Sequence, residues 1–79
     1  MRYYRITMCE GERTAWNGFS KEEAIAKMDE LKGAGFATLE EYEVPEALIR
    51  QSHNPLLTAD IAVRGRKPIS EQRYVSKSK

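Results

Sequence analysis

Cys9 and His53 are the two side chains that could together perform nucleophilic chemistry, because a histidine can take the proton of a thiol. The chain has one of each, and nothing in their spacing brings them together. A packed thiol and a solvated histidine explain both residues. A structural zinc site takes about four Cys or His ligands, and only two are present. We therefore predict a protein that is not an enzyme and that holds no metal or cofactor.

Carboxylates follow one another in the middle of the chain, at Glu40, Glu41, Glu43 and Glu46. Such a run can imitate phosphates toward a basic groove of another protein, or it can form the solvent face and charged edge of a sheet. We favour the sheet interpretation. The glycines of residues 33–35 come after an expected helix rather than before one, so they predict a helix end and not a phosphate-binding loop.

The sharpest local motif is Arg64-Gly65-Arg66-Lys67-Pro68. It resembles the core of an AT-hook, in which an extended Arg-Gly-Arg lies in the narrow minor groove of A·T-rich DNA. The resemblance implies a nucleic-acid contact through the basic side chains of this segment. The alternative is a basic turn between two C-terminal elements.

Charge is unevenly distributed along the chain. Residues 1–49 contain six Lys and Arg against ten Asp and Glu, a balance of −4, whereas residues 50–79 contain seven against two, a balance of +5. This asymmetry fits a basic segment that meets an acidic partner. It fits equally a basic segment that lies across the acidic part of the same chain.

The elements that must position these residues begin with a hairpin. Residues 3–9 alternate as a half-buried strand, with Tyr4, Ile6 and Met8 on one face, and residues 14–16 return antiparallel. We expect residues 17–18 to break or bulge the ladder. Trp16 and Phe19 are then expected to pack under the following helix, with an exposed aromatic contact site as the alternative.

A capping box sets the start of the main helix. Ser20 and Glu23 have the required spacing, and an apolar stripe follows at Ala24, Ile25, Met28 and Leu31, so we predict a helix over residues 21–32. We predict a third strand over residues 38–44. Because Leu39 is out of phase with Tyr42 and Val44, that strand is expected to contain a bulge or to start late.

The remaining elements are a short helix and a basic segment. Pro45 suits the start of a helix over residues 45–52. Residues 56–63 fit either a helix opened by Asn54 and Pro55 or a fourth strand at residues 60–63, and we favour the strand. The prediction is thus one α+β domain over residues 1–79. It has an antiparallel sheet of three to four strands, one main helix on one face (a ββαβ core, residues 2–44), and a basic, partly flexible C-terminal extension at residues 54–79.

Composition narrows the class of protein. Hydrophobic residues make up 41% of the 79 residues and charged residues 32%, which is typical of a globular domain rather than a disordered chain. The sequence has no membrane span, and its first residues lack the apolar run of a signal peptide. A lone cysteine agrees with a reducing compartment. We therefore expect a cytoplasmic protein, either a monomer or a homodimer.

Several families resemble this chain. Residues 23–36 are similar to the helix-to-strand passage of sporulation-related repeats that bind peptidoglycan, and small antitoxins share a strand-strand-helix-strand core. Over the whole length, the small size and the lack of catalytic residues resemble small phage accessory proteins of the anti-CRISPR type. That resemblance implies an inhibitor, acting in the cytoplasm of a bacterial host, that docks on a protein or ribonucleoprotein such as a CRISPR effector.

Two functions from different classes follow from the sequence. The first is a non-catalytic protein that inhibits a host defence nuclease complex by binding it. The alternative is a small nucleic-acid-binding module that uses the basic segment. The residues expected to contact the partner are Trp16, Tyr42, Arg64, Arg66, Lys67 and Arg73.

Overall fold

The fold is a four-stranded antiparallel sheet with helices on both of its faces. In the computed structural model, which describes residues 1–8, 13–31 and 37–74, the strand order is β2-β1-β3-β4. The predicted α+β class is confirmed. The elements are β1 (Arg2–Met8), β2 (Arg13–Gly18), α1 (Lys21–Leu31), β3 (Ala37–Glu43), α2 (Glu46–Arg50), α3 (Pro55–Ala62) and β4 (Ser70–Tyr74).

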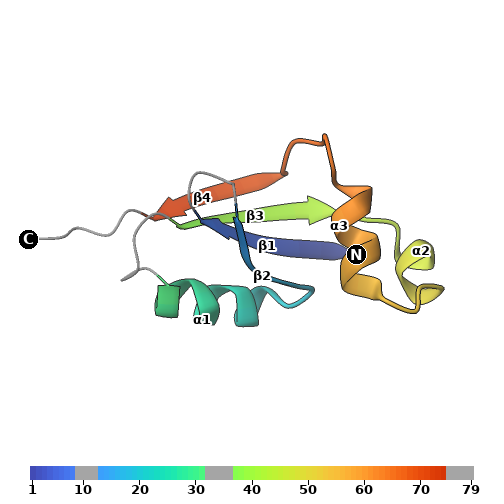
Figure 1. The fold of residues 1–79 in the computed structure, drawn as a ribbon, viewed down its shortest axis with the longest axis horizontal. Coiled ribbons are helices and arrows are strands. Elements are labelled where there is room, and N and C mark those ends of the chain that lie inside the picture. Colours follow the sequence, from blue (N-terminus) through green and yellow to red (C-terminus); the bar gives the residue numbers. More distant parts are fainter. Residues whose placement is uncertain (9–12, 32–36, 75–79) are drawn as a thin grey trace, which may run out of the picture.

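Two apolar clusters lie on opposite faces of the sheet, because successive residues of a strand point to opposite sides. Tyr4 and Ile6 of β1 pack with Ala24 and Met28 of α1. Tyr3 contributes to the second cluster, together with buried residues of β3, α2 and α3. Figure 1 shows α1 along one side of the sheet and the pair α2 and α3 at the end where the N-terminus lies. The second cluster consists of Tyr3, Tyr42, Val44, Ile49, Ala59 and Val63.

The second face explains the phase of β3. Leu39 lies on the α1 side, whereas Tyr42 and the neighbouring Val44 belong to the cluster beneath α3. The strand pairs with β1 without a register shift from Ala37 to Glu43. The expected bulge or late start in this strand is therefore wrong, since both phases of apolar residues are used.

The irregularity of the sheet lies in the hairpin instead. Trp16 is opposite Ile6 and Thr14 is opposite Thr7, so Ala15 is the extra residue, and β2 continues to Gly18. The predicted break at residues 17–18 is therefore wrong. The indole of Trp16 lies over Gly18, where an added Cβ would stand 2.7 Å from Cζ2. Glycine thus makes room for the packed tryptophan.

Helix α1 starts as its capping sequence predicts. The Glu23 amide donates a hydrogen bond to Ser20 Oγ at 3.3 Å. Ala24 and Met28 are buried and Leu31 packs against the same cluster, but Ile25 remains 52% exposed. The stripe is therefore oriented as predicted, although one of its members faces out. The expected last residue, Lys32, lies outside the described residues, as do the glycines after it and Cys9.

Helix α3 covers Pro55–Ala62, so the favoured strand at residues 60–63 is wrong. Asn54 caps α3, accepting a hydrogen bond from the Leu57 amide at 3.3 Å, and Pro55 occupies the first turn. Ser52 and Thr58 share a hydroxyl–hydroxyl hydrogen bond that joins the linker to the helix. Ala59 is fully buried, because its small side chain lets the helix lie close to the sheet.

Residues 54–74 are part of the domain rather than an extension from it. Helix α2 is shorter than expected, with Pro45 as its N-cap. Helix α3 supplies Ala59 and Val63 to the core, and β4 completes the sheet by pairing with β3. The fourth strand thus comes from residues 70–74 and not from residues 60–63.

Candidate partner-binding surface

The six residues predicted to bind a partner separate into an interior pair and an exposed group. Trp16 is half-buried against the α1 cluster, and Tyr42 is only 3% exposed. Arg64, Arg66 and Lys67 are exposed in the connection from α3 to β4, and Arg73 is exposed on β4. Tyr42 is too buried to contact a partner. Of the six predicted residues, only the four cations are exposed.

Tyr42 belongs to a half-buried polar network centred on Arg5, which we call the Arg5 network. The Arg5 guanidinium lies 2.8 Å from Glu40 Oε1 and 3.1 Å from Asp60 Oδ1, and it donates to the Tyr42 hydroxyl at 3.1 Å. Tyr42 in turn donates to Glu40 at 3.0 Å. The guanidinium carbon also stands 5.4 Å from the centre of the Tyr42 ring, within range of a cation–π contact.

Strand register brings most of this network together. Arg5 of β1 is directly opposite Glu40 of β3 and Asn17 of β2. Asn17 donates to the Tyr3 hydroxyl at 3.0 Å, and that hydroxyl donates to Asp60 at 3.4 Å. Only Asp60 comes from outside the sheet. The network therefore fastens α3 to three strands.

The network also sets the protonation of its tyrosines. Burial, followed by the hydrogen bond to Glu40, raises the pKa of Tyr42 to about 12. Burial is also the main cause that raises the pKa of Tyr3. Burial, the largest single effect, lowers the pKa of Arg5, but the contacts with Glu40, Tyr42 and Asp60 together raise it above its ordinary value. Both phenols stay protonated and Arg5 stays charged at neutral pH.

The basic loop, residues 64–69, begins with a tight turn over residues 63–66. The Arg64 amide donates to the Ile61 carbonyl, the Arg66 amide donates to the Val63 carbonyl, and Gly65 has a left-handed φ of +76°. Open space surrounds Gly65. An AT-hook requires an extended Arg-Gly-Arg, whereas this segment turns, so the geometry corresponds to the alternative of a basic turn between two elements.

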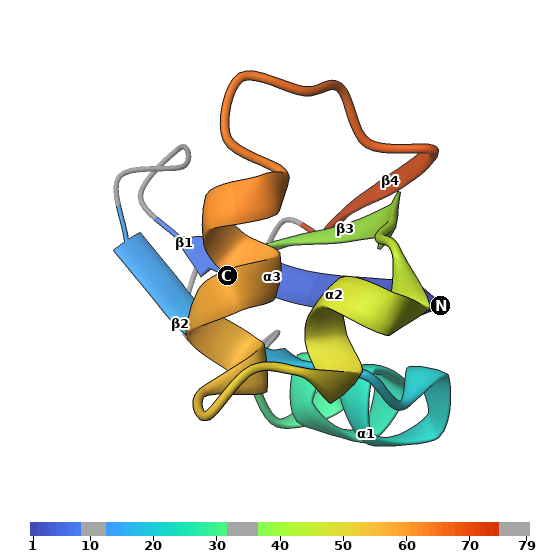
Figure 2. The same cartoon turned by 90° about the vertical axis from the view of Figure 1, so that its right-hand side faces the viewer.

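The basic loop lies on the opposite side of the molecule from helix α1, which carries several carboxylates (Figure 2). Arg64 approaches Asp60 at 3.9 Å while remaining 69% exposed. Within the described ranges no ion pair joins Arg66, Lys67 or Arg73 to a carboxylate. These three cations therefore do not neutralise carboxylates of the described part of the chain.

Exposed apolar side chains precede and follow the cations of the basic loop in the sequence. Ile61 of α3 is 53% exposed, and Ile69, the last residue before β4, is 55% exposed. A surface that combines cations with aliphatic side chains suits a partner that is acidic and partly apolar. The sequence analysis did not identify these isoleucines as contact residues. Their position next to the basic motif is the sequence feature that could have indicated them.

The acidic run is paired within the molecule. Glu40 contacts Arg5, Arg2 lies 3.4 Å from Glu41 and 3.5 Å from Glu43, and Glu46 pairs with Arg50 at 2.7 Å. These carboxylates therefore match the predicted charged sheet face better than a phosphate-like surface.

Other candidate sites carry less chemistry. His53 is exposed in the linker between α2 and α3. Among the described residues, no three His, Cys, Asp or Glu side chains are grouped to hold a metal ion. In the same part of the chain, no helix is long and apolar enough to cross a membrane. A groove of about 340 Å³ lies between α1 and the β3–β4 pair.

The structure also adds residues that the sequence did not reveal as important. Arg5 and Asp60 organise the Arg5 network, yet they are 55 positions apart. The local pattern placed Arg5 on the second face of a strand without showing that a helix covers that face.

Comparison with protein-family models, with curated proteins and with solved structures found no match for this chain.

Proposed function

We propose that this chain is a non-catalytic binding protein that docks on a larger protein or ribonucleoprotein through the basic loop. The observation that carries the proposal is the set of exposed cations at Arg66 and Lys67, which lack an ion pair among the described residues and lie between exposed Ile61 and Ile69. Such side chains contribute little to the stability of the domain. They are available to an acidic partner.

The state of the other charged groups supports a binding role. Arg5, Glu40 and Asp60 are held by one another at 2.8 to 3.1 Å. A catalytic acid or base must be within reach of a substrate proton, and these groups are already engaged in the attachment of α3. The features left without an internal role are surface features.

The target that we propose is a host defence nuclease complex, reached in the cytoplasm of a bacterial host. The support is the likeness in size and style to phage accessory proteins of the anti-CRISPR type, together with the spatial separation of the basic loop from α1. A ribonucleoprotein presents the negative charge of its phosphates, to which acidic side chains of its protein subunits can add. A loop with two unpaired cations and two aliphatic neighbours fits such a surface.

The test compares two charge-reversed variants in a pull-down from lysate, with and without nuclease. Arg66→Glu combined with Lys67→Glu removes the basic loop's cations. The matched control, Lys21→Glu with Lys27→Glu, makes the same charge change on α1. The proposal expects a defined protein complex that survives nuclease, is retained by the control and is lost by the loop variant. Equal retention by both variants would exclude the loop as the contact surface.

A second candidate is a nucleic-acid-binding module, and it is favoured by the exposure of Arg64, Arg66, Lys67 and Arg73. Phosphate contacts release counterions, so affinity for a duplex or single-stranded oligonucleotide should fall steeply with added salt. In the pull-down, this candidate predicts that the captured material disappears with nuclease. Fluorescence anisotropy with labelled oligonucleotides at about 50 mM salt separates the two, since absence of binding there would eliminate the nucleic-acid candidate.

A further inference from the structure

Strand β4 is an edge of the sheet. Within the described residues it has a neighbour, β3, on one side only, and Figure 1 shows it as the outermost strand. An edge strand exposes backbone N–H and C=O groups that can pair with another strand. Natural edges are commonly protected by proline, bulges, short strand length or charged side chains. Residues 70–74 contain no proline, and their pairing with β3 has no register shift.

The sequence of this strand is complementary to itself. In an antiparallel pair of two β4 strands centred on Gln72, Glu71 of each copy lies directly opposite Arg73 of the other. Opposite charges at directly facing positions stabilise a strand pair. A shift of the centre to Glu71 would oppose two glutamates, and a shift to Arg73 would oppose two arginines. Charge therefore selects one register among those related by a twofold axis perpendicular to the sheet.

The monomer leaves these two charges without complementary neighbours. Glu71 is exposed and lies opposite Glu40 of β3, a like charge that is already paired with Arg5. Arg73 is exposed and lies opposite Thr38. A partner strand on the free edge would give each of the two an opposite charge.

We propose that β4 is a homodimerisation edge, through which two copies of this chain join their sheets into one of eight antiparallel strands. The proposed partner is a second copy, because in the antiparallel pair each Glu71 lies opposite the Arg73 of the other copy. The two Gln72 residues can face each other either as a hydrogen-bonded or as a non-hydrogen-bonded pair. A twofold axis can pass through both kinds of antiparallel residue pair. This inference does not depend on the proposed partner of the basic loop.

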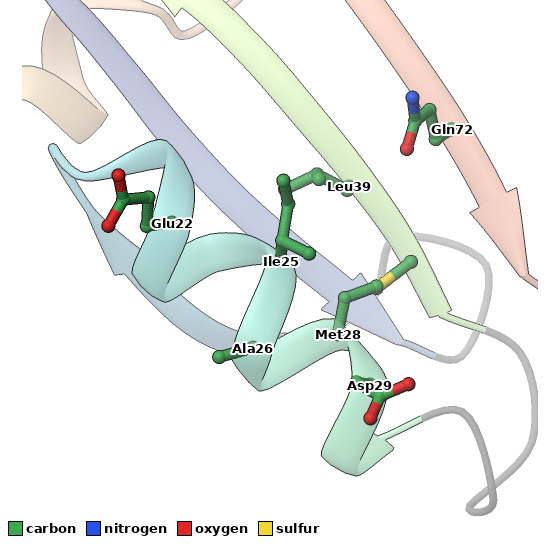
Figure 3. Close-up of a pocket in the computed structure, with 7 residues that line it drawn as sticks. All are labelled: Glu22, Ile25, Ala26, Met28, Asp29, Leu39 and Gln72. Atoms are coloured by element: carbon green, nitrogen blue, oxygen red, sulfur yellow. The ribbon is translucent and has the colours of Figure 1, made fainter.

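Pairing at this edge also changes the groove beside α1. Its lining comes from one face of α1 and from β3 and β4, and Gln72 forms the β4 wall, as Figure 3 shows. In the dimer, Gln72 meets its symmetry mate, and amide side chains can donate and accept reciprocally. The two grooves then lie side by side on one sheet face. Ile25, Met28 and Leu39 form the apolar part of each groove.

The test is a charge swap followed by sedimentation equilibrium from about 10 µM to 1 mM protein, because a small interface predicts weak association. Glu71→Arg and Arg73→Glu each convert both cross-strand pairs into like-charge pairs, and each should weaken dimerisation at least about tenfold. The double variant Glu71→Arg with Arg73→Glu restores opposite charges and should restore the dimer. An equimolar mixture of the two single variants should form heterodimers.

A second measurement fixes the register. Residues that face each other in an antiparallel pair have Cα atoms about 4.5–5.5 Å apart, within the range for a disulfide. Gln72→Cys, in a Cys9→Ser background, should therefore form a covalent dimer on mild oxidation. A wild-type protein that stays monomeric over the whole concentration range would overturn the proposal. Single variants that associate as strongly as wild type would also overturn it. The same holds if the edge binds an extended segment of a different protein in place of a second copy.

Discussion

The Arg5 network and the basic loop meet at the ion pair of Asp60 with Arg64, yet they use charge in opposite ways. In the network, strand register and α3 hold the Arg5 guanidinium within 3.1 Å of two carboxylates, at 20% exposure. In the loop, a tight turn carries its cations into solvent. The same residue types therefore stabilise the fold where register supplies partners, and remain available for binding where it does not.

The largest expected effect comes from removing Arg5. Arg5→Ala leaves Glu40 and Asp60 half-buried without their shared cation, and breaking such a pair is more costly than the pair is stabilising. We expect the free energy of unfolding to fall by about 2–4 kcal/mol, measured by urea denaturation. Arg2 provides the control on the same strand, since its ion pairs are long and exposed. Arg2→Ala should cost less than about 1 kcal/mol, and equal losses in the two variants would contradict the comparison.

A smaller loss is expected from Asp60→Asn. The amide keeps the shape of the side chain but removes the charge that receives the Arg5 guanidinium and the Tyr3 hydroxyl. We expect a loss of about 1–2 kcal/mol. Because Asp60 acts through Arg5, the double variant with Arg5→Ala should lose less than the sum of the single losses. Additive losses in this double-mutant cycle would show that Asp60 stabilises α3 independently of Arg5.

The network also predicts a loss of stability at high pH. The pKa of Tyr42 is raised from 10.0 to about 12, so the folded chain binds more protons than the unfolded chain between these values. The contribution of Tyr42 to stability should therefore be constant below pH 10. It should be lost progressively as the pH rises toward 12. Denaturation across this range measures the slope, and Tyr42→Phe should reduce it. Part of the slope should persist in that variant, because the pKa of Tyr3 is raised too.

The smallest effect is expected in the basic loop. Arg66→Ala and Lys67→Ala should each change the free energy of unfolding by less than about 0.5 kcal/mol, as is usual for surface substitutions. The same denaturation series measures this, with Arg5→Ala as the destabilised reference. A loss above about 1 kcal/mol would mean that the loop is held by its cations and would remove the contrast with the network.

Local signals were enough for several elements. The spacing of Ser20 and Glu23 placed the start of α1, and the alternation of residues 3–9 placed β1 with the correct faces. The apolar residues also predict the third strand, but the expected bulge or late start is wrong. Leu39 and Tyr42 conflict only if a single face of the sheet is covered. A helix on the second face removes the conflict, and the local signal for that helix, the Asn54 cap with Pro55, does not show which face it covers.

Two errors in the C-terminal third have the same physical origin. Residues 56–63 are apolar without clear periodicity, so the Asn54 cap and Pro55 were outweighed by the strand formers in the run. β4 is polar, and its residues alternate no apolar face. It is a strand because β3 presents an unpaired edge to it. The state of both segments depends on what they pack or pair against.

The sequence by itself determined the α+β class, the capped main helix, the antiparallel hairpin and the basic character of the α3–β4 connection. These features follow from interactions between residues a few positions apart. A short stretch of sequence is therefore enough to predict them. Tertiary structure alone decided that α3 covers the second face, that Arg5 meets Asp60, and that β4, like β2, forms an edge of the sheet. Each of these joins residues distant in the chain, and their free energy comes from burial and register that no local window contains.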